Sequence, residues 1–127
     1  MTGIVFARVP RDDYDVLRRA LDAVLLPADD LTKPDRAFFA LSDSDGPIGY
    51  VGLEGTGVDL LLRSLVVLPS RKRQGYGSLL VTHAEAAARQ AGAERLHLLT
   101  TTASGFFRAR GYIPTERANA PVAIAGT

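Results

Sequence analysis

Runs of alternating or continuous apolar residues divide the chain into predicted strands. The strands predicted from these runs are 3–9, 36–42, 48–54, 58–68 and 93–100, and a last extended segment begins at Tyr112. The run 58–68 is apolar at nearly every position, which is typical of a central strand with both faces buried. A cluster of turn formers, Asp43-Ser44-Asp45-Gly46-Pro47, predicts a hairpin between the second and third strands.

Apolar residues at helical spacing predict three helices between these strands. The first follows Asp12, whose carboxylate can cap it, and is expected to close at Pro27 before a polar loop over 28–35. A long Ala-rich helix stops at Gly92, and a short one stops at Gly111. Strands and helices in this order predict an α/β fold with a mixed sheet.

Composition then limits the classes of function. The chain has 127 residues, 15 basic and 14 acidic side chains and no cysteine. This length predicts a single domain, 1–127, and the balanced charge argues against nucleic acid or a membrane surface as a partner. Thiolate nucleophiles are excluded, and the two histidines do not form a metal motif. Without a leader or a long apolar run, we expect a soluble cytoplasmic protein, and a homodimer stays open.

The most informative feature is a basic, glycine-containing loop between the apolar strand and the long helix. It reads Ser70-Arg71-Lys72-Arg73-Gln74-Gly75-Tyr76-Gly77. A helix amino terminus presents unpaired N–H groups, glycines allow close approach, and the basic side chains add local positive charge. This pattern predicts a phosphate site. The alternative is an ordinary turn with solvated basic side chains.

The stretch 65–80 resembles the acetyl-coenzyme A motif of the GCN5-related N-acetyltransferases (GNAT). Lys72, Gly75 and Gly77 stand at the motif positions, although Lys72 departs from the usual Arg or Gln. The order of elements also matches the family fold along essentially the whole chain. The resemblance implies a central, mostly antiparallel sheet with helices on both faces and a shortened C-terminal strand. It also implies acetyl-coenzyme A as cosubstrate, without a metal.

The resemblance further implies which residues contact the coenzyme. Backbone groups of 65–67 would hold the pantetheine arm, one amide would face the thioester oxygen, and the loop amides would hold the pyrophosphate. Phe107 stands where many relatives carry the tyrosine that protonates the leaving thiolate. The expected coenzyme residues are Leu65, Val66, Val67, Lys72, Arg73, Gln74, Gly75, Tyr76, Gly77, Ser78 and Phe107.

A narrower resemblance concerns the acceptor. The stretches 61–67 and 98–112 resemble the small acetyltransferases found among arsenic-resistance genes, and the second is also similar to the acetyltransferase domain of N-acetylglutamate synthases. This similarity implies a small-molecule amine acceptor, such as a glutamate-like amino acid or an analogue. Thr101, in the Leu-Thr-Thr segment, is then expected at the acceptor.

Polar residues in and near the apolar strand are the remaining candidates. Arg63 could bind a substrate carboxylate, or instead form a salt bridge with Asp59 or Glu54. Ser64 would lie near the reacting amine, and both residues face the substrate only if a bulge intervenes. Glu54 is the first candidate for the general base and Asp59 a weaker one.

Tyr112 is a candidate acid for the leaving thiolate, or else a core aromatic residue. The absence of a tyrosine at position 107 keeps a second class of function open, a non-catalytic module that binds acetyl-coenzyme A. A third alternative is acetylation of a protein amino terminus or lysine.

Overall fold

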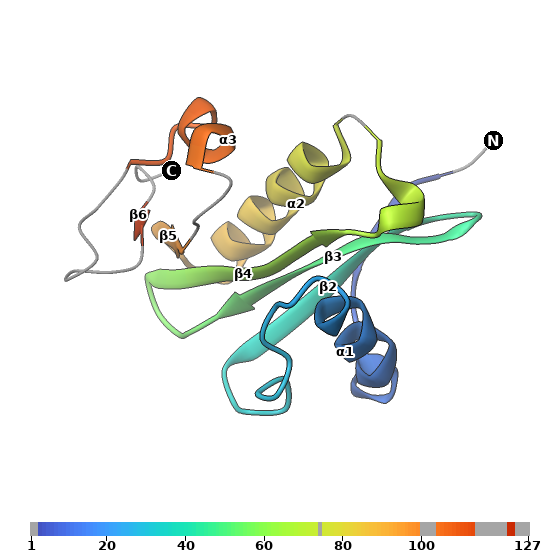
Figure 1. Ribbon diagram of the computed structural model, residues 1–127. Helices are drawn as coiled ribbons and strands as arrows, with labels where there is room; N and C mark the ends of the chain where they lie inside the picture. The colour runs from blue at the N-terminus through green and yellow to red at the C-terminus, as the bar shows by residue number, and fades with distance from the viewer. Residues whose placement is uncertain (1–2, 74, 100–103, 114–121, 124–127) are drawn as a thin grey trace.

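The computed structural model describes residues 3–73, 75–99, 104–113 and 122–123. Its strands form one six-stranded sheet in the order β1-β2-β3-β4-β5-β6 (Figure 1). Neighbouring strands are antiparallel, except for the parallel pair β4 and β5. The strands are β1 (Val5–Arg8), β2 (Arg36–Asp43), β3 (Gly46–Glu54), β4 (Asp59–Val67), β5 (Arg95–Leu98) and β6 (Val122–Ala123). The predicted mixed, mostly antiparallel sheet is confirmed.

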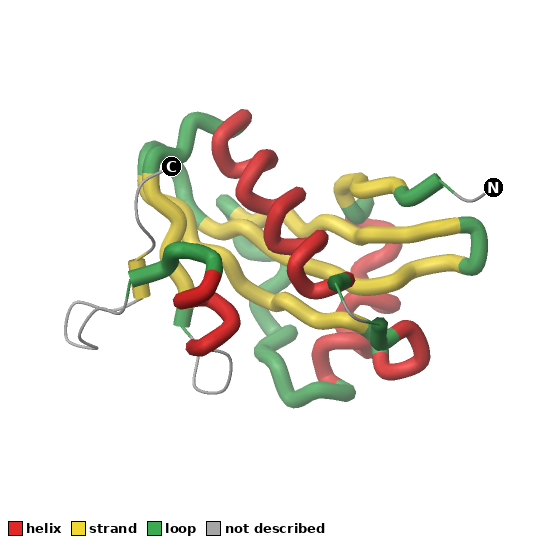
Figure 2. Tube along the Cα trace, turned by 90° about the horizontal axis from the view of Figure 1, so that it is seen from above, coloured by secondary structure: helices red, strands yellow, loops and turns green. Residues whose placement is uncertain are grey.

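Helices cover both faces of this sheet, as expected (Figures 1 and 2). Helix α1 (Tyr14–Asp22) lies on one face, and its buried side chains Tyr14, Leu17 and Leu21 repeat at helical spacing. Helix α2 (Tyr76–Gln90) crosses the other face, where α3 (Ser104–Ala109) also packs. Two short 3-10 turns, η1 (Arg11–Asp13) and η2 (Pro69–Arg71), precede α1 and α2.

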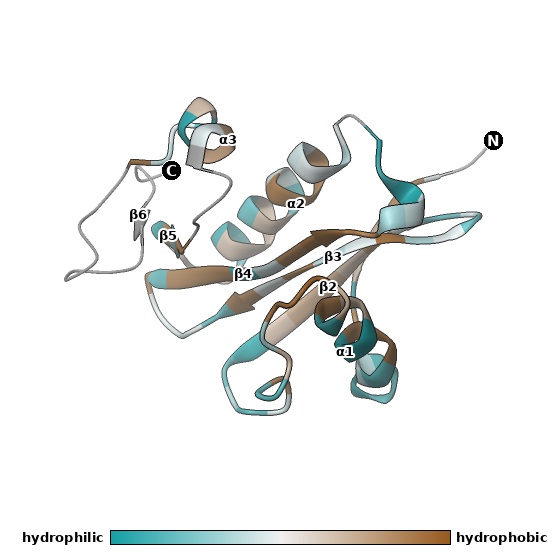
Figure 3. Cartoon of the chain, viewed as in Figure 1, coloured by the Kyte–Doolittle hydropathy of each residue, from teal (hydrophilic) through white to brown (hydrophobic). Residues whose placement is uncertain are grey.

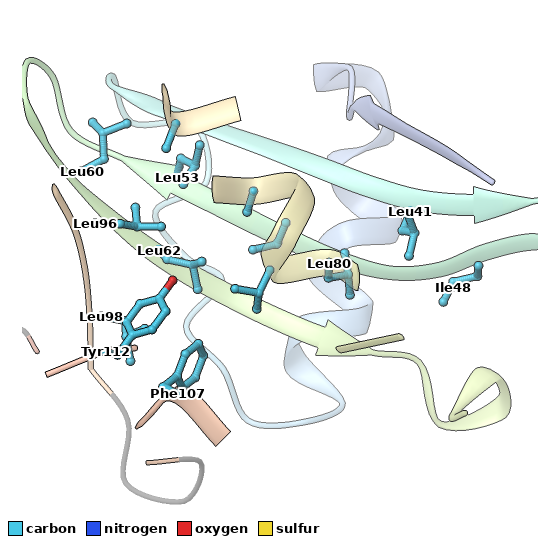
Figure 4. Close-up of a cluster of buried hydrophobic side chains, with 14 residues drawn as sticks. Leu41, Ile48, Leu53, Leu60, Leu62, Leu80, Leu96, Leu98, Phe107 and Tyr112 are labelled. Atoms are coloured by element: carbon cyan, nitrogen blue, oxygen red, sulfur yellow. The ribbon is translucent and has the colours of Figure 1, made fainter. Parts of the chain in front are cut away.

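Two hydrophobic clusters hold these layers together. The larger lies between α2 and the sheet and reaches Phe107 and Tyr112 at the α3 end (Figure 4). The smaller joins α1 to Phe38, Tyr50 and Val66 of the sheet. Because both clusters consist almost entirely of apolar side chains removed from water, they provide most of the driving force for packing.

The first helix differs from the prediction at both ends. Asp12 lies in the 3-10 turn η1 and does not cap α1, whose N-cap residue Asp13 makes no side-chain capping bond. The helix ends at Asp22, well before Pro27. The predicted hairpin and helix ends are confirmed, since the segment 43–47 joins β2 to β3 and Gly92 and Gly111 follow their helices with left-handed φ values of 96° and 95°.

Strand β4 contains the bulge on which the site interpretation depends. Leu60 and Leu62 pack in the α2-side cluster, whereas Val66 packs in the α1-side cluster, so the alternation shifts by one residue between them. The register with β3 shifts at the same place, and Ser64 has a left-handed φ of 58°. The strand is central in the sheet, as predicted, but its burial is incomplete, because buried residues alternate with half-buried ones.

The parallel pairing of β4 and β5 is short. It begins at Asp59 opposite Arg95 and ends at Leu61 opposite His97, although β4 continues to Val67. Beyond Leu61, therefore, no described residue forms a ladder with this edge of β4. The backbone N–H and C=O groups on that edge are available to a ligand.

Candidate coenzyme and acceptor site

The amino terminus of α2 has the geometry of an anion site. Gly75 is the N-cap residue, with a φ of 95° that favours glycine, and no side chain caps the helix. The helical backbone bonding begins with Leu79 N–H donating to the Gly75 carbonyl at 2.9 Å, so the amides of Gly77 and Ser78 precede it. A Cβ placed on Gly75 or Gly77 would meet nothing within 4 Å, so there is open space where a side chain would project from either residue.

The basic side chains of this loop divide into two kinds. Lys72 and Arg73 are exposed, and the Arg73 guanidinium lies 5.8 Å from the centre of the Tyr76 ring. Arg71, expected to add positive charge, is instead paired with Asp43 and donates to the Gly46 and Pro47 carbonyls. Arg71 holds the β2–β3 hairpin against the basic loop. In Figure 3 this loop is the hydrophilic segment that follows β4. Gln74 lies outside the described residues.

The unpaired edge of β4 leads directly into this loop. Side chains of Leu65 and Val67 are half-buried toward α2, and Val66 is buried on the α1 side, so the strand is anchored from both faces. After Leu68, whose N–H donates to the Ile48 carbonyl at 2.9 Å, the chain turns through η2 to the amino terminus of α2. The β4 edge at 65–67 and the amides at 75–78 thus follow one another along the chain, and we call the two together the coenzyme strip.

Ser78 connects this strip to the chain that follows α3. Arg110 donates to the Ser78 hydroxyl at 2.6 Å, to Thr82 at 2.9 Å and to Glu85 at 3.0 Å. The three acceptors share one stripe of α2, because they lie four and three residues apart. This set of contacts fixes the first turn of α2 against the end of α3.

Tyr112 and Phe107 belong to the core. The Tyr112 hydroxyl donates to Glu85 at 2.8 Å, and burial together with that carboxylate raises the pKa of Tyr112 far above its ordinary value. Phe107 is buried, with its ring centre 5.0 Å from that of Tyr112 (Figure 4). The core alternative named for Tyr112 therefore matches its position, and its proton is held by Glu85 on the α2 side of the sheet.

Arg63 lies on the opposite face, in a four-membered ion-pair network with Asp30, Glu54 and Arg36. Its Nη1 donates to Asp30 at 2.7 Å and to Glu54 at 2.9 Å, and its Nη2 donates to the other Asp30 oxygen at 2.8 Å. Arg36 lies 3.1 Å from Asp30 and 3.5 Å from Glu54. The alternative of a salt bridge from Arg63 to Glu54 is confirmed.

The remaining donors of Arg63 are also used. Its Nε donates to the Ser64 hydroxyl at 3.1 Å, and its Nη2 reaches the Pro27 carbonyl at 3.4 Å. Ser64 is itself buried at the bulge. The structure thus brings Glu54, Arg63 and Ser64 together, but a substrate carboxylate would have to displace Asp30 from Arg63. Thr101 lies outside the described residues.

Asp30→Asn is expected to lower the free energy of unfolding by about 2 kcal/mol at pH 7, since it removes one charge from a largely buried network. Hydrogen bonds from Arg63 hold the pKa of Asp30 well below its usual range, against the opposing effect of burial. A depressed folded pKa contributes stability above the unfolded pKa, near 3.9, that is lost as pH falls toward the folded value. Urea titrations should show the full difference in free energy of unfolding between wild type and Asp30→Asn above about pH 5. The difference should become smaller below about pH 4.

The matched control is Asp15→Asn, because the Asp15 side chain is 82% exposed and only 3.6 Å from Arg18. Its unfolding curve should follow wild type at every pH. A constant difference between wild type and Asp30→Asn from pH 7 to pH 3 would contradict the ionised network.

A polar cluster that the sequence predictions missed lies at the start of β4 and β5. His97 and Arg95 both contact the Asp59 carboxylate, at 2.8 and 2.7 Å. The alternation of Arg95 and His97 with buried Leu96 and Leu98 indicates a shared polar face, but only the parallel pairing brings Asp59 to it. Asp30 is harder to foresee, since it comes from an irregular loop.

Two further observations concern the described residues alone. Nowhere in them do three or more His, Asp or Glu side chains gather as a metal ion would require. None of their helices has the length and apolar character to span a bilayer.

Comparison with known proteins identifies the family of this chain. The family model described as "Acetyltransferase (GNAT) domain" matches residues 34–114. An amino-acid acetyltransferase of Ralstonia nicotianae is 35% identical over 99 residues, which cover 72% of this chain and 21% of the relative. The chain thus spans about a fifth of that relative's length.

Solved structures agree on the fold. N-acetylglutamate synthase from Neisseria gonorrhoeae, complexed with coenzyme A and L-arginine, superposes with a TM-score of 0.79 at 21% identity, covering 93% of this chain and 29% of that one. A GNAT-family acetyltransferase from Staphylococcus aureus Mu50 gives a TM-score of 0.77 at 14% identity, covering 94% and 89%. With the family model matching most of its length and the fold shared, the chain belongs to the GNAT acetyltransferases.

Proposed function

We propose that this protein transfers the acetyl group of acetyl-coenzyme A directly to the amine of a small molecule. The observation that carries the proposal is the coenzyme strip, in which the unpaired edge of β4 runs into the open amino terminus of α2. Direct transfer suits a chain without cysteine, because the amine attacks the thioester itself. The C–N bond forms, the C–S bond breaks, and coenzyme A leaves as a thiolate.

Each part of the strip would have its own task. Backbone groups of 65–67 would bind the pantetheine arm as an added strand does, and one amide there would stabilise the thioester oxygen as negative charge develops. The amides at 75–78 would bind the pyrophosphate, which a helix amino terminus favours. Exposed Lys72 and Arg73, together with Gln74, would add charge and polar contacts at the phosphates.

For the acceptor we propose an amino acid or a close analogue. The support is the name of the Ralstonia relative, an amino-acid acetyltransferase, and the match to N-acetylglutamate synthase. Arg63, Ser64 and Thr101 remain the proposed acceptor residues. Both carboxylates considered as the general base already have partners, because Glu54 pairs with Arg63 and Arg36 and Asp59 pairs with Arg95 and His97. A carboxylate of the acceptor would compete with Asp30 for Arg63.

The test is release of free thiol from acetyl-coenzyme A with a panel of acceptors. We expect thiol release that depends on an amino acid, with acetylation at its amine seen by mass spectrometry. Coenzyme binding without acceptor-dependent thiol release would favour the non-catalytic module. Peptides that outcompete every free amino acid would contradict the proposed acceptor class and favour protein acetylation.

A further inference from the structure

His97 projects from the face of the sheet opposite α2. Its neighbours in β5, Leu96 and Leu98, are buried in the α2-side cluster, so the alternation of the strand turns His97 and Arg95 to the other face. Asp59 pairs with Arg95 across the parallel ladder and reaches the same face. Asp59 and Arg95 are about half exposed, at 46% and 47%, so this part of the face is open to solvent.

The contacts determine which nitrogen of His97 can act as a base. Nε2 lies 2.8 Å from Asp59 Oδ1, and Arg95 donates to both oxygens of the same carboxylate, at 2.7 and 3.1 Å. Hydrogen bonds from Arg95 and His97 hold the pKa of Asp59 at about 2, so this carboxylate accepts at neutral pH. Nε2 therefore carries a hydrogen, and in the neutral imidazole the lone pair is on Nδ1.

The position of His97 in the sheet places this lone pair near the proposed reaction. The β4–β5 ladder ends at the pair Leu61 and His97, so His97 lies where the two strands part. Because the pyrophosphate amides belong to α2, the coenzyme would occupy the α2 side of that opening. The amine must attack the thioester from the other side, which is the face that carries His97.

Glu54 lies in the same row across the sheet, opposite Leu61, which in turn pairs with His97. Glu54 differs from His97 in its partners, because the guanidinium groups of Arg36 and Arg63 both form ion pairs with its carboxylate. Among the described residues, one imidazole nitrogen is hydrogen-bonded and no hydrogen bond is formed with the other. The Glu54 side chain is 29% exposed and the His97 side chain 21%, so the two candidates differ in their charged partners and not in exposure.

We propose that His97 is the general base of this acetyltransferase and that Asp59, held by Arg95, is the positioning residue that fixes its tautomer. The proposal rests on the proposed function. Nδ1 takes one proton from the protonated amine of the acceptor, directly or through one water, and the lone pair freed on nitrogen then attacks the thioester carbon. As the C–S bond breaks, the nitrogen gives its second proton to the departing thiolate, and the imidazolium returns the first to solvent.

The test compares pH–rate profiles of wild type, His97→Gln and the control His83→Gln. Glutamine retains an N–H donor for Asp59, and His83, the chain's other histidine, stacks on Phe6 of β1 with ring centres 4.8 Å apart. The charged groups that face the imidazole from β4 and β5 are Asp59 and Arg95.

At pH 7 we expect His97→Gln to lower kcat/KM for the acceptor about 100-fold. The KM for acetyl-coenzyme A and the melting temperature should stay at wild-type values.

This deficit should shrink as the pH rises toward the pKa of the acceptor amine, because the amine then loses its proton without a base. His83→Gln should keep the wild-type profile. Asp59→Asn should lower kcat/KM about 10-fold or more, since an amide also stabilises the wrong tautomer. If His97→Gln does not fold, His97→Asn and Asp59→Asn carry the test.

A wild-type profile for His97→Gln, or a deficit equal at every pH, would overturn the proposal while acetyl transfer by the wild type still stands. A pH-dependent deficit in Glu54→Gln, absent from His97→Gln, would assign the base to Glu54 instead. Inactive wild-type protein would overturn the proposed function itself, and the assignment of His97 with it.

Discussion

Gly77→Asp is expected to weaken coenzyme binding about 100-fold while leaving the protein folded. Gly77 is the second residue of α2, and a side chain there would enter open space beside the amides proposed to bind the pyrophosphate. Two unit charges about 4 Å apart near a protein surface repel by ~4 kcal/mol, and about 3 kcal/mol of that corresponds to the expected loss. Without coenzyme, a carboxylate in the first turn stabilises a helix, so the melting temperature should not fall.

The matched control is Gly77→Asn, which has nearly the same shape and no charge. Calorimetric titration with coenzyme A should show Gly77→Asn within a few-fold of wild type and Gly77→Asp far weaker. The gap between the two variants should close as salt is added, because charge repulsion at the surface is screened. Equal affinities of the Asp and Asn variants would remove the amino terminus of α2 from the coenzyme site.

Arg63→Met is expected to lower the free energy of unfolding by about 3 kcal/mol. The Arg63 side chain is 12% exposed and pairs with Asp30 and Glu54, which are 21% and 29% exposed. Methionine fills part of the space beside Phe38, over which the guanidinium lies at 5.5 Å, but leaves both carboxylates short of a partner. Breaking a buried pair costs 3–5 kcal/mol, and the partial exposure puts the expected loss at the lower end.

Arg95→Met provides the comparison in stability, because Arg95 and Asp59 are about half exposed and such pairs contribute roughly 0.5 kcal/mol. Urea unfolding at pH 7 should separate the two variants by more than 2 kcal/mol. If Arg63→Met instead unfolds like Arg95→Met and only the KM for the acceptor rises, then Arg63 is a substrate ligand and its contact with Asp30 is incidental to folding.

The sequence predicted most of the fold because its elements are locally encoded. The apolar runs of β2 and β3, the turn formers between them, and Gly92 and Gly111 each act within a few residues. Errors arose where tertiary contacts decide the outcome. The end of α1 at Asp22 is one case, and the unpaired edge of β4 is another, since its apolar run contains no sign that β5 leaves it after Leu61.

The candidate site, like the fold, was predictable where it depends on residues close together in the sequence. The glycine loop at the start of α2 can be predicted from residue spacing alone. The structure then shows open space beside Gly75 and Gly77. Contacts between side chains far apart in the sequence cannot be predicted from local spacing. Asp30 meets Arg63 from an irregular loop, and Asp59 meets His97 only because two parallel strands share a register.

The proposed coenzyme site is tested most directly by a crystal structure with acetyl-coenzyme A bound. The pyrophosphate is expected within hydrogen-bond distance of the amides at 75–78, with the pantetheine arm along the unpaired edge of β4 at 65–67. The thioester should then face the side of the sheet that carries His97. A coenzyme bound elsewhere, for example in the hollow between β1, β2 and α1 lined by Ala7, Val16 and Ala40, would contradict the account.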